Sequence, residues 1–202
     1  IREVKEMGFT SCQIACWDMD CHNEVIAKKV KAALDEYGVR VSTFWAGWSG
    51  PTEWNFTGGP MTLGLVPPAY RMKRAEELIR AGEFAAKIGV TQVATHVGFL
   101  PENMNDAQYM GVLAALRYIA KECSKREINF LFETGQETPV TLLRTIEKIG
   151  TGNAFINFDT ANLIMYGKAN PIDALDMVGG YVRGVTVRDC TLPRIMFHSV
   201  GY

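Results

Sequence analysis

Short apolar runs alternate with helical segments along nearly the whole chain, and this alternation restricts the fold more than any other feature of the sequence. The six runs lie at residues 12–16, 39–45, 90–96, 128–133, 154–159 and 182–189. Most show little polar alternation, which is typical of strands buried on both faces of a parallel sheet. Helices are predicted over residues 1–8, 23–37, 69–88, 106–126, 139–149 and 171–178. The sequence therefore predicts an α/β fold with a parallel sheet covered by helices.

Two architectures share this rhythm, an open doubly wound sheet and a (β/α)8 barrel. A dinucleotide-binding sheet carries a glycine-rich turn after its first strand, but here that turn reads ACWDMDCHNE. In barrels, functional side chains collect where the strands end. Aromatic or ionisable residues stand at these ends in this chain, namely Trp45, Trp48, His96, Glu133, Asp159 and Asp189. This pattern favours the barrel.

Composition excludes several classes of function. The 21 basic and 22 acidic residues give a formal net charge of −1, which argues against a nucleic-acid-binding surface. No apolar run approaches the ~20 residues of a membrane span, so no membrane association is expected. The five cysteines are odd in number and irregularly spaced, so they do not form a disulfide framework. Reduced thiols indicate a cytoplasmic protein.

Glu133 and Asp159 each end an apolar run, INFLFE and FINFD. A carboxylate in such a place costs folding free energy unless it is paired or bound to a metal. Two carboxylates and a histidine suit a hard divalent ion such as Mg²⁺ or Mn²⁺. Alternatively, the two acids pair with Arg or Lys, or cap the helix that follows. The residues alone leave both interpretations open.

The segment of residues 46–68 is long for a loop between a strand and a helix, and such loops are often functional. Trp48 and Trp54 within it, and Trp45 before it, could pack on the C–H surface of a sugar, or the loop could pack on itself. His96 could bind a metal or a sugar hydroxyl. Arg71, with Arg74, could hold a phosphate or a carboxylate, or could be a solvated helix charge.

Four segments give the chain a recognisable resemblance: WSGPTEWNFTGGPMTLGLVPPAYR, THVGFLPEN, FETGQET and NFDTANLIMYG. Over roughly residues 8–189 the sequence resembles the sugar phosphate isomerases and epimerases of the xylose isomerase-like TIM barrels, which are related to AP endonuclease family 2. The resemblance implies a (β/α)8 barrel that uses a divalent ion (Mn²⁺, Mg²⁺ or Co²⁺). The implied reaction is proton transfer through an ene-diolate, with a sugar or sugar phosphate as the substrate.

The resemblance also assigns site residues. Epimerases of the family bind the metal with Glu, Asp, His and Glu from strands five to eight. Glu133 matches the first Glu, which is also catalytic, and Asp159 matches the Asp. Thr186 stands where the family has its His, in the segment TVRD that ends at Asp189, and no later residue matches the last Glu. Asn162 occupies a position where some members carry a second His.

For substrate contacts we take Trp45, His96, Asn162 and Arg71 as candidates, and the roles of Thr186 and Asp189 as uncertain. The competing hypotheses are a non-catalytic sugar-binding barrel that has lost its metal and an AP-endonuclease-like nuclease. The nuclease is disfavoured because the chain has only three histidines and because its net charge is −1. The sequence leaves open the sugar, its phosphorylation, the choice between isomerase, epimerase and dehydratase, and whether the chain forms a homo-oligomer.

The chain has 202 residues, whereas a whole barrel takes ~250. The family comparison places the six predicted strands as strands two to seven. We therefore expect residues 1–202 to be a single xylose isomerase-like domain truncated at both ends, without strands one and eight. The tail CTLPRIMFHSVGY does not resemble the family, which suggests a frameshift or a truncated gene model. Because two of the four metal ligands are missing, this polypeptide is predicted to be weakly active or inactive.

Overall fold

The computed structural model describes residues 1–188 and residue 190. The strands are β1 (Ser11–Cys16), β2 (Arg40–Ala46), β3 (Gln92–Thr95), β4 (Asn129–Glu133), β5 (Ala154–Asp159) and β6 (Val182–Thr186). The α-helices are α1 (Arg2–Glu6), α2 (Glu24–Tyr37), α3 (Gly59–Thr62), α4 (Pro68–Lys87), α5 (Tyr109–Ser124), α6 (Pro139–Ile149), α7 (Thr160–Met165) and α8 (Pro171–Val178). Two 3-10 turns, Met19–Cys21 and Gly179–Tyr181, complete the regular structure.

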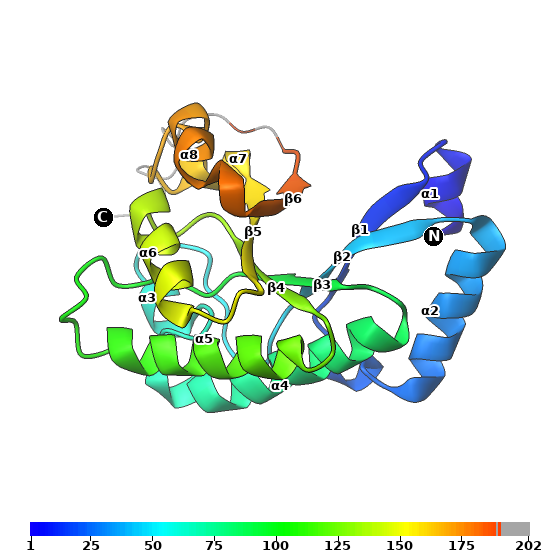
Figure 1. Cartoon of the computed structure of the whole chain (residues 1–202), viewed down its shortest axis with the longest axis horizontal. Helices are drawn as coiled ribbons and strands as arrows, with labels where there is room; N and C mark the ends of the chain where they lie inside the picture. The colour runs from blue at the N-terminus through cyan, green and yellow to red at the C-terminus, as the bar shows by residue number, and fades with distance from the viewer. Residues whose placement is uncertain (189, 191–202) are drawn as a thin grey trace.

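All six strands are parallel and lie in the order β1-β2-β3-β4-β5-β6, which is also their order in the chain. Each strand therefore pairs with the next one in sequence, as in a (β/α)8 barrel and unlike a doubly wound sheet. Figure 1 shows the sheet bent into an open trough, with α4 and α5 running beneath its middle strands. The fold is an α/β half-barrel of six strands, which confirms the predicted incomplete barrel.

The predicted strands and helices are all present, with small differences at their ends. The last strand stops at Thr186 rather than at residue 189, and the helix predicted from residue 106 begins at Tyr109. The short helix α7 was not predicted. It follows β5 directly. The Asp159 side chain accepts a hydrogen bond from the backbone N–H of Asn162 and so caps the start of the helix.

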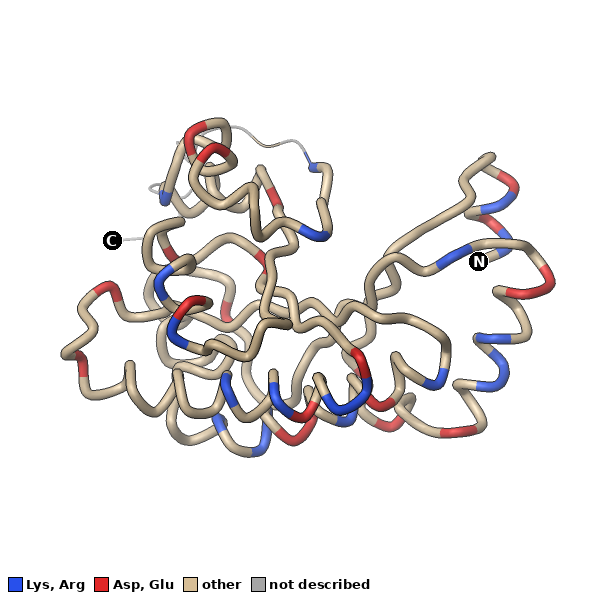
Figure 2. The backbone as a smooth tube through the Cα atoms, viewed as in Figure 1, with Lys and Arg blue, Asp and Glu red and all other residues tan. Residues whose placement is uncertain are grey.

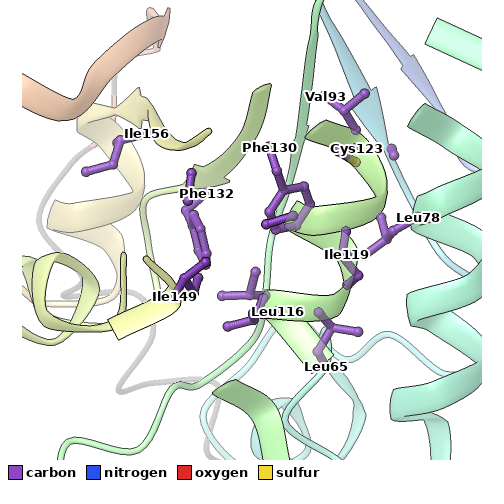
Figure 3. Packing of buried hydrophobic residues seen from close by; sticks show 14 of the residues in the cluster. Leu65, Leu78, Val93, Leu116, Ile119, Cys123, Phe130, Phe132, Ile149 and Ile156 are labelled. Carbon is purple, nitrogen blue, oxygen red and sulfur yellow. The ribbon is translucent and has the colours of Figure 1, made fainter. Parts of the chain in front are cut away.

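Alternate strand residues face the helices and form the main core. On β4, Phe130 and Phe132 are fully buried between the sheet and the helices. Figure 3 shows them packed among Leu116 and Ile119 of α5 and Ile149 of α6. Because strand side chains alternate between faces, the intervening residues point to the concave side of the sheet.

The concave side is narrow enough for side chains of distant strands to meet. Gln13 Nε2 of β1 lies 3.1 Å from Asn157 Oδ1 of β5, to which it donates a hydrogen bond. Gly184 of β6 permits this approach, because a Cβ atom at that position would lie 2.2 Å from Asn157 Oδ1. The curvature therefore brings the ends of β1 and of β4–β6 around one space.

The loop between β2 and α4 is held by two charged residues of α4. Arg74 is 1% exposed, and its guanidinium donates hydrogen bonds to four loop carbonyls, those of Ser49, Pro51, Thr62 and Gly64. Glu77 accepts hydrogen bonds from the backbone N–H and the hydroxyl of Ser49. The loop is therefore an ordered part of the barrel rim.

Basic and acidic residues are interspersed along the outer helices α2, α4 and α5 (Figure 2). Among the described residues, no helix combines the length and apolar character needed to cross a membrane.

Candidate active site

A cavity of about 480 Å³ opens where the strands end on the concave side of the sheet. Its walls come from β1–β6 and the segments that follow them, and comprise Gln13, Ala15, Trp17, Trp45, Trp54, His96, Glu133, Asp159, Asn162, Met165, Tyr166, Thr186 and Arg188. The structure thus brings together residues that are far apart in sequence, among them six of the predicted site residues: Trp45, His96, Glu133, Asp159, Asn162 and Thr186.

Glu133 ends β4 on the floor of the cavity and is 3% exposed. Asn157 Nδ2 donates a hydrogen bond to Glu133 Oε2 and another, of 2.9 Å, to Thr186 Oγ1. Burial raises the pKa of Glu133 to about 7, and the neighbouring charge of Asp159 adds to this rise. Glu133 can therefore hold or release a proton near neutral pH.

Asp159 ends β5 and is 1% exposed. Its Oδ1 accepts the hydrogen bond that caps α7, at 3.0 Å from the backbone N of Asn162. Its Oδ2 lies 2.6 Å from Nη2 of Arg188, with which it forms an ion pair. Both alternatives to metal binding that the sequence left open, helix capping and pairing with a basic residue, therefore occur at Asp159.

His96 follows β3 and lies close to the rings of Trp45 and Trp54, with ring centroids 5.8 and 5.2 Å away. Burial lowers the pKa of His96 to about 3, and the positive charge of Arg188 adds to this effect. The imidazole is therefore neutral at physiological pH. Its Nε2 lies 3.3 Å from Asn162 Nδ2, so it can accept a hydrogen bond from that amide.

Trp17 lines the cavity beside the predicted tryptophans, and we did not predict it. Its ring centroid is 5.2 Å from those of Trp45 and Trp48, and 6.1 Å from that of Trp54. The signal was present in the sequence: Gln13 and Ala15 face the cavity, and Trp17 continues their alternation one residue beyond β1. Tyr166 and Arg188 were also missed, because no sequence pattern shows that their side chains reach the floor.

Arg71 and Arg74 do not line the cavity. The guanidinium of Arg71 donates hydrogen bonds to the carbonyls of Leu65 and Val66 and, at 2.9 Å, to Gln108 Oε1. Arg74 is buried under the loop, where desolvation lowers its pKa to about 10. Asp189, the remaining predicted residue, lies outside the described residues.

A divalent ion on the cavity floor would need ligands that are free to face it. Asn157 already donates to Glu133, and Arg188 is paired with Asp159. A guanidinium beside Asp159 would also repel a second cation. In the part of the chain that the structure describes, no three His, Cys, Asp or Glu side chains are grouped so that they could hold a metal. The described residues therefore do not fit the divalent ion that the resemblance implied.

The sequence model of the xylose isomerase-like TIM barrel family matches residues 1–194. A xylose isomerase domain protein from Planctomyces limnophilus is 29% identical, with a TM-score of 0.91 over 96% of this chain and 69% of that one. The 3-keto-D-glucoside 4-epimerase from E. coli is 18% identical, with a TM-score of 0.72 over 98% and 80%. A xylose isomerase-like TIM barrel protein from Mycobacterium smegmatis, solved in complex with magnesium, is 16% identical, with a TM-score of 0.69 over 93% and 64%. No curated protein matches the sequence.

Proposed function

Because this chain belongs to the xylose isomerase-like TIM barrel family, we propose that it is a carbohydrate isomerase or epimerase in which Glu133 moves the proton. The observation that carries this proposal is a buried glutamate on the floor of a cavity, with a pKa raised to about 7. A general acid–base group works best when its pKa lies near the working pH. An aspartate or glutamate with an ordinary pKa would be a much weaker base.

The residues around Glu133 support this role. The ionised Glu133 takes the proton from the carbon beside the substrate carbonyl, which leaves an ene-diolate. The protonated Glu133 then returns the proton to the neighbouring carbon. A proton also passes from the substrate hydroxyl to the former carbonyl oxygen, so that the carbonyl moves by one carbon and the isomerisation is complete. Asn157 positions Glu133 through its hydrogen bond to Oε2, and Gln13 in turn holds Asn157. Inversion at a single carbon would need a second acid on the opposite face of the substrate.

The negative charge of the ene-diolate oxygen needs a positive group or hydrogen-bond donors nearby. Arg188 supplies the positive charge at this end of the cavity, and its side chain is half exposed there. However, Arg188 is already neutralised by Asp159. Thr186 stands where the resemblance places a histidine ligand. We therefore propose that the turnover of this chain is weak.

The test is exchange of substrate hydrogen with D₂O, which detects proton abstraction even when net turnover is slow. D-Fructose and D-tagatose, with their 6-phosphates, serve as substrates, and Mn²⁺ is added or omitted. We expect deuterium incorporation by the wild type and a loss of about 100-fold or more in Glu133→Gln. Glu147→Gln, an exposed glutamate of α6, is the matched control and should exchange like the wild type. Equal exchange by wild type and Glu133→Gln would refute the proposed role.

A sugar-binding barrel without catalysis is the second candidate. The Arg188–Asp159 ion pair favours this candidate, because Arg188 neutralises Asp159, one of the two carboxylates on the floor. This candidate predicts that a sugar binds in the cavity and that no deuterium is incorporated into the bound sugar.

A further inference from the structure

We infer that the cavity takes an uncharged carbohydrate rather than a sugar phosphate, and that Trp17 is the residue that selects it. This inference deepens the proposed function and rests on it for the class of ligand. It depends on two features of the cavity: the one cationic side chain among its described lining residues is already paired, and its walls are aromatic.

The first feature concerns charge. A phosphate group is usually held by Arg or Lys side chains with free donors, or by the N-terminus of a helix. Among the described residues that line the cavity, Arg188 is the one cationic side chain, and its Nε and Nη2 are directed at Asp159 and Asn162. A phosphate that approached it would also meet the carboxylates of Asp159 and Glu133. The cavity therefore offers an anion no net attraction.

The two arginines at the start of α4 do not change this result. Arg71 and Arg74 direct their guanidinium groups at backbone carbonyls of the β2–α4 loop. Releasing Arg74 toward a ligand would leave these buried carbonyls without donors, which costs free energy for each of them. Both arginines hold the loop and are not available to bind a phosphate.

The second feature is the pair of walls made by Trp17 and Trp54. Their side chains are 43% and 39% exposed, although both rings are large and apolar. The two ring planes meet at 88°, so they present two surfaces nearly at a right angle. The face of an indole carries a partial negative charge and attracts the weakly positive C–H groups of a sugar ring. A ring with hydroxyl edges and a C–H face would fit between these walls and the polar floor.

Trp17 is held in this exposed position by its neighbours. A Cβ atom on Gly47 would lie 2.4 Å from the Trp17 ring, so only glycine allows the indole to rest on this backbone. The rings of Trp45 and Trp48 both pack against it, with centroids 5.2 Å away. An exposed ring that is fixed before the ligand arrives loses little conformational entropy on binding. Trp17 therefore presents a fixed, exposed indole face that a ligand can contact.

The test compares ligands that differ only in the phosphate. Calorimetry and tryptophan fluorescence would measure the binding of D-fructose, D-tagatose and methyl α-D-glucoside, and of the 6-phosphates of the two ketoses. We expect at least one uncharged sugar to bind at least tenfold more tightly than any phosphate. Trp17→Ala should weaken that binding by about tenfold, the change that 1.4 kcal/mol produces. Trp17→Phe keeps an aromatic face, so it should retain most of the affinity and shows that the site still folds.

Tyr118→Ala on α5 removes an equally exposed aromatic residue away from the cavity and should bind like the wild type. Tighter or equal binding of a phosphate, full affinity in Trp17→Ala, or no binding of any uncharged sugar would each overturn the inference. Failure of the proposed function can be distinguished from failure of this inference. If the chain is not an isomerase, no deuterium exchange is observed, but the uncharged sugar still binds.

Discussion

Glu137 is the buried acid whose replacement should change stability most clearly with pH. It lies between β4 and α6 and is 1% exposed. Neither of its carboxylate oxygens has a hydrogen-bond partner among the described residues. Burial raises the pKa of Glu137 to about 8, from an ordinary value of 4.5. The folded chain therefore keeps this side chain protonated at pH values where the unfolded chain ionises it.

The size of the effect follows from this difference in pKa. A raised pKa contributes stability that is fully present below pH 4.5 and is lost as the pH rises through about 8. Each unit of pKa difference corresponds to about 1.36 kcal/mol. Between pH 5 and pH 8 the wild type should therefore lose about 3–4 kcal/mol of unfolding free energy through Glu137 alone. Glu137→Gln, which has no such proton, should not show this loss.

The assay is urea denaturation at pH 5, 6, 7 and 8 for the wild type, Glu137→Gln and the exposed control Glu147→Gln. The pKa of Glu133 is raised in the same direction, so the wild type should lose additional stability over this range. The difference between Glu137→Gln and the wild type isolates residue 137. We expect this difference to grow in favour of the variant by about 3–4 kcal/mol from pH 5 to pH 8. A difference that stays constant over this range would refute the reasoning.

Three further predictions concern the site and its loop. The rate of proton exchange should rise as the pH rises through about 7, since Glu133 must be ionised to act as a base, and a pH–rate profile that is flat from pH 5 to 9 would contradict this role. The wild type should bind Mn²⁺ weakly or not at all, and Arg188→Ala should raise the Mn²⁺ affinity by roughly tenfold or more, because it frees Asp159 and removes a positive charge. Calorimetry or electron paramagnetic resonance would measure the affinity, and equally weak or absent binding in the variant would count against the effect of the ion pair. Arg74→Met should lower the unfolding free energy by about 3–5 kcal/mol, because four loop carbonyls lose their donor. Urea denaturation would measure the loss. A loss below about 1 kcal/mol, the net value of one ordinary hydrogen bond, would show that the guanidinium does not hold the loop.

The strands of the sheet could be predicted from the sequence, because a strand buried on both faces requires a continuous apolar run. The runs INFLFE and FINFD are apolar on both faces of the strand, and the acid at each end marks the position where the strand reaches the cavity. For the same reason, the placement of Glu133 and Asp159 on one floor could be predicted from the parallel order of the strands.

The partners of these acids could not be predicted in the same way. Arg188 lies 29 residues after Asp159, and nothing in the sequence pattern indicates that its side chain turns back to the floor. Arg71 resembled a ligand-binding arginine because it stands after a long loop. Its actual acceptors are backbone carbonyls of that loop, and backbone acceptors leave no trace in side-chain patterns.

The four carbonyls that bind Arg74 also determine which segment of the barrel can change in length or sequence. They belong to residues on both sides of the segment 52–61, so one guanidinium fastens both ends of that segment to α4. The entropy cost of closing a loop grows only slowly with its length, by about 0.6 kcal/mol per doubling. Insertions or replacements within 52–61, which contains Trp54, should therefore be tolerated while the anchors remain. Recognition could thus diverge among relatives of this chain, or be redesigned, by exchanging one short segment and leaving the strands and their acids untouched.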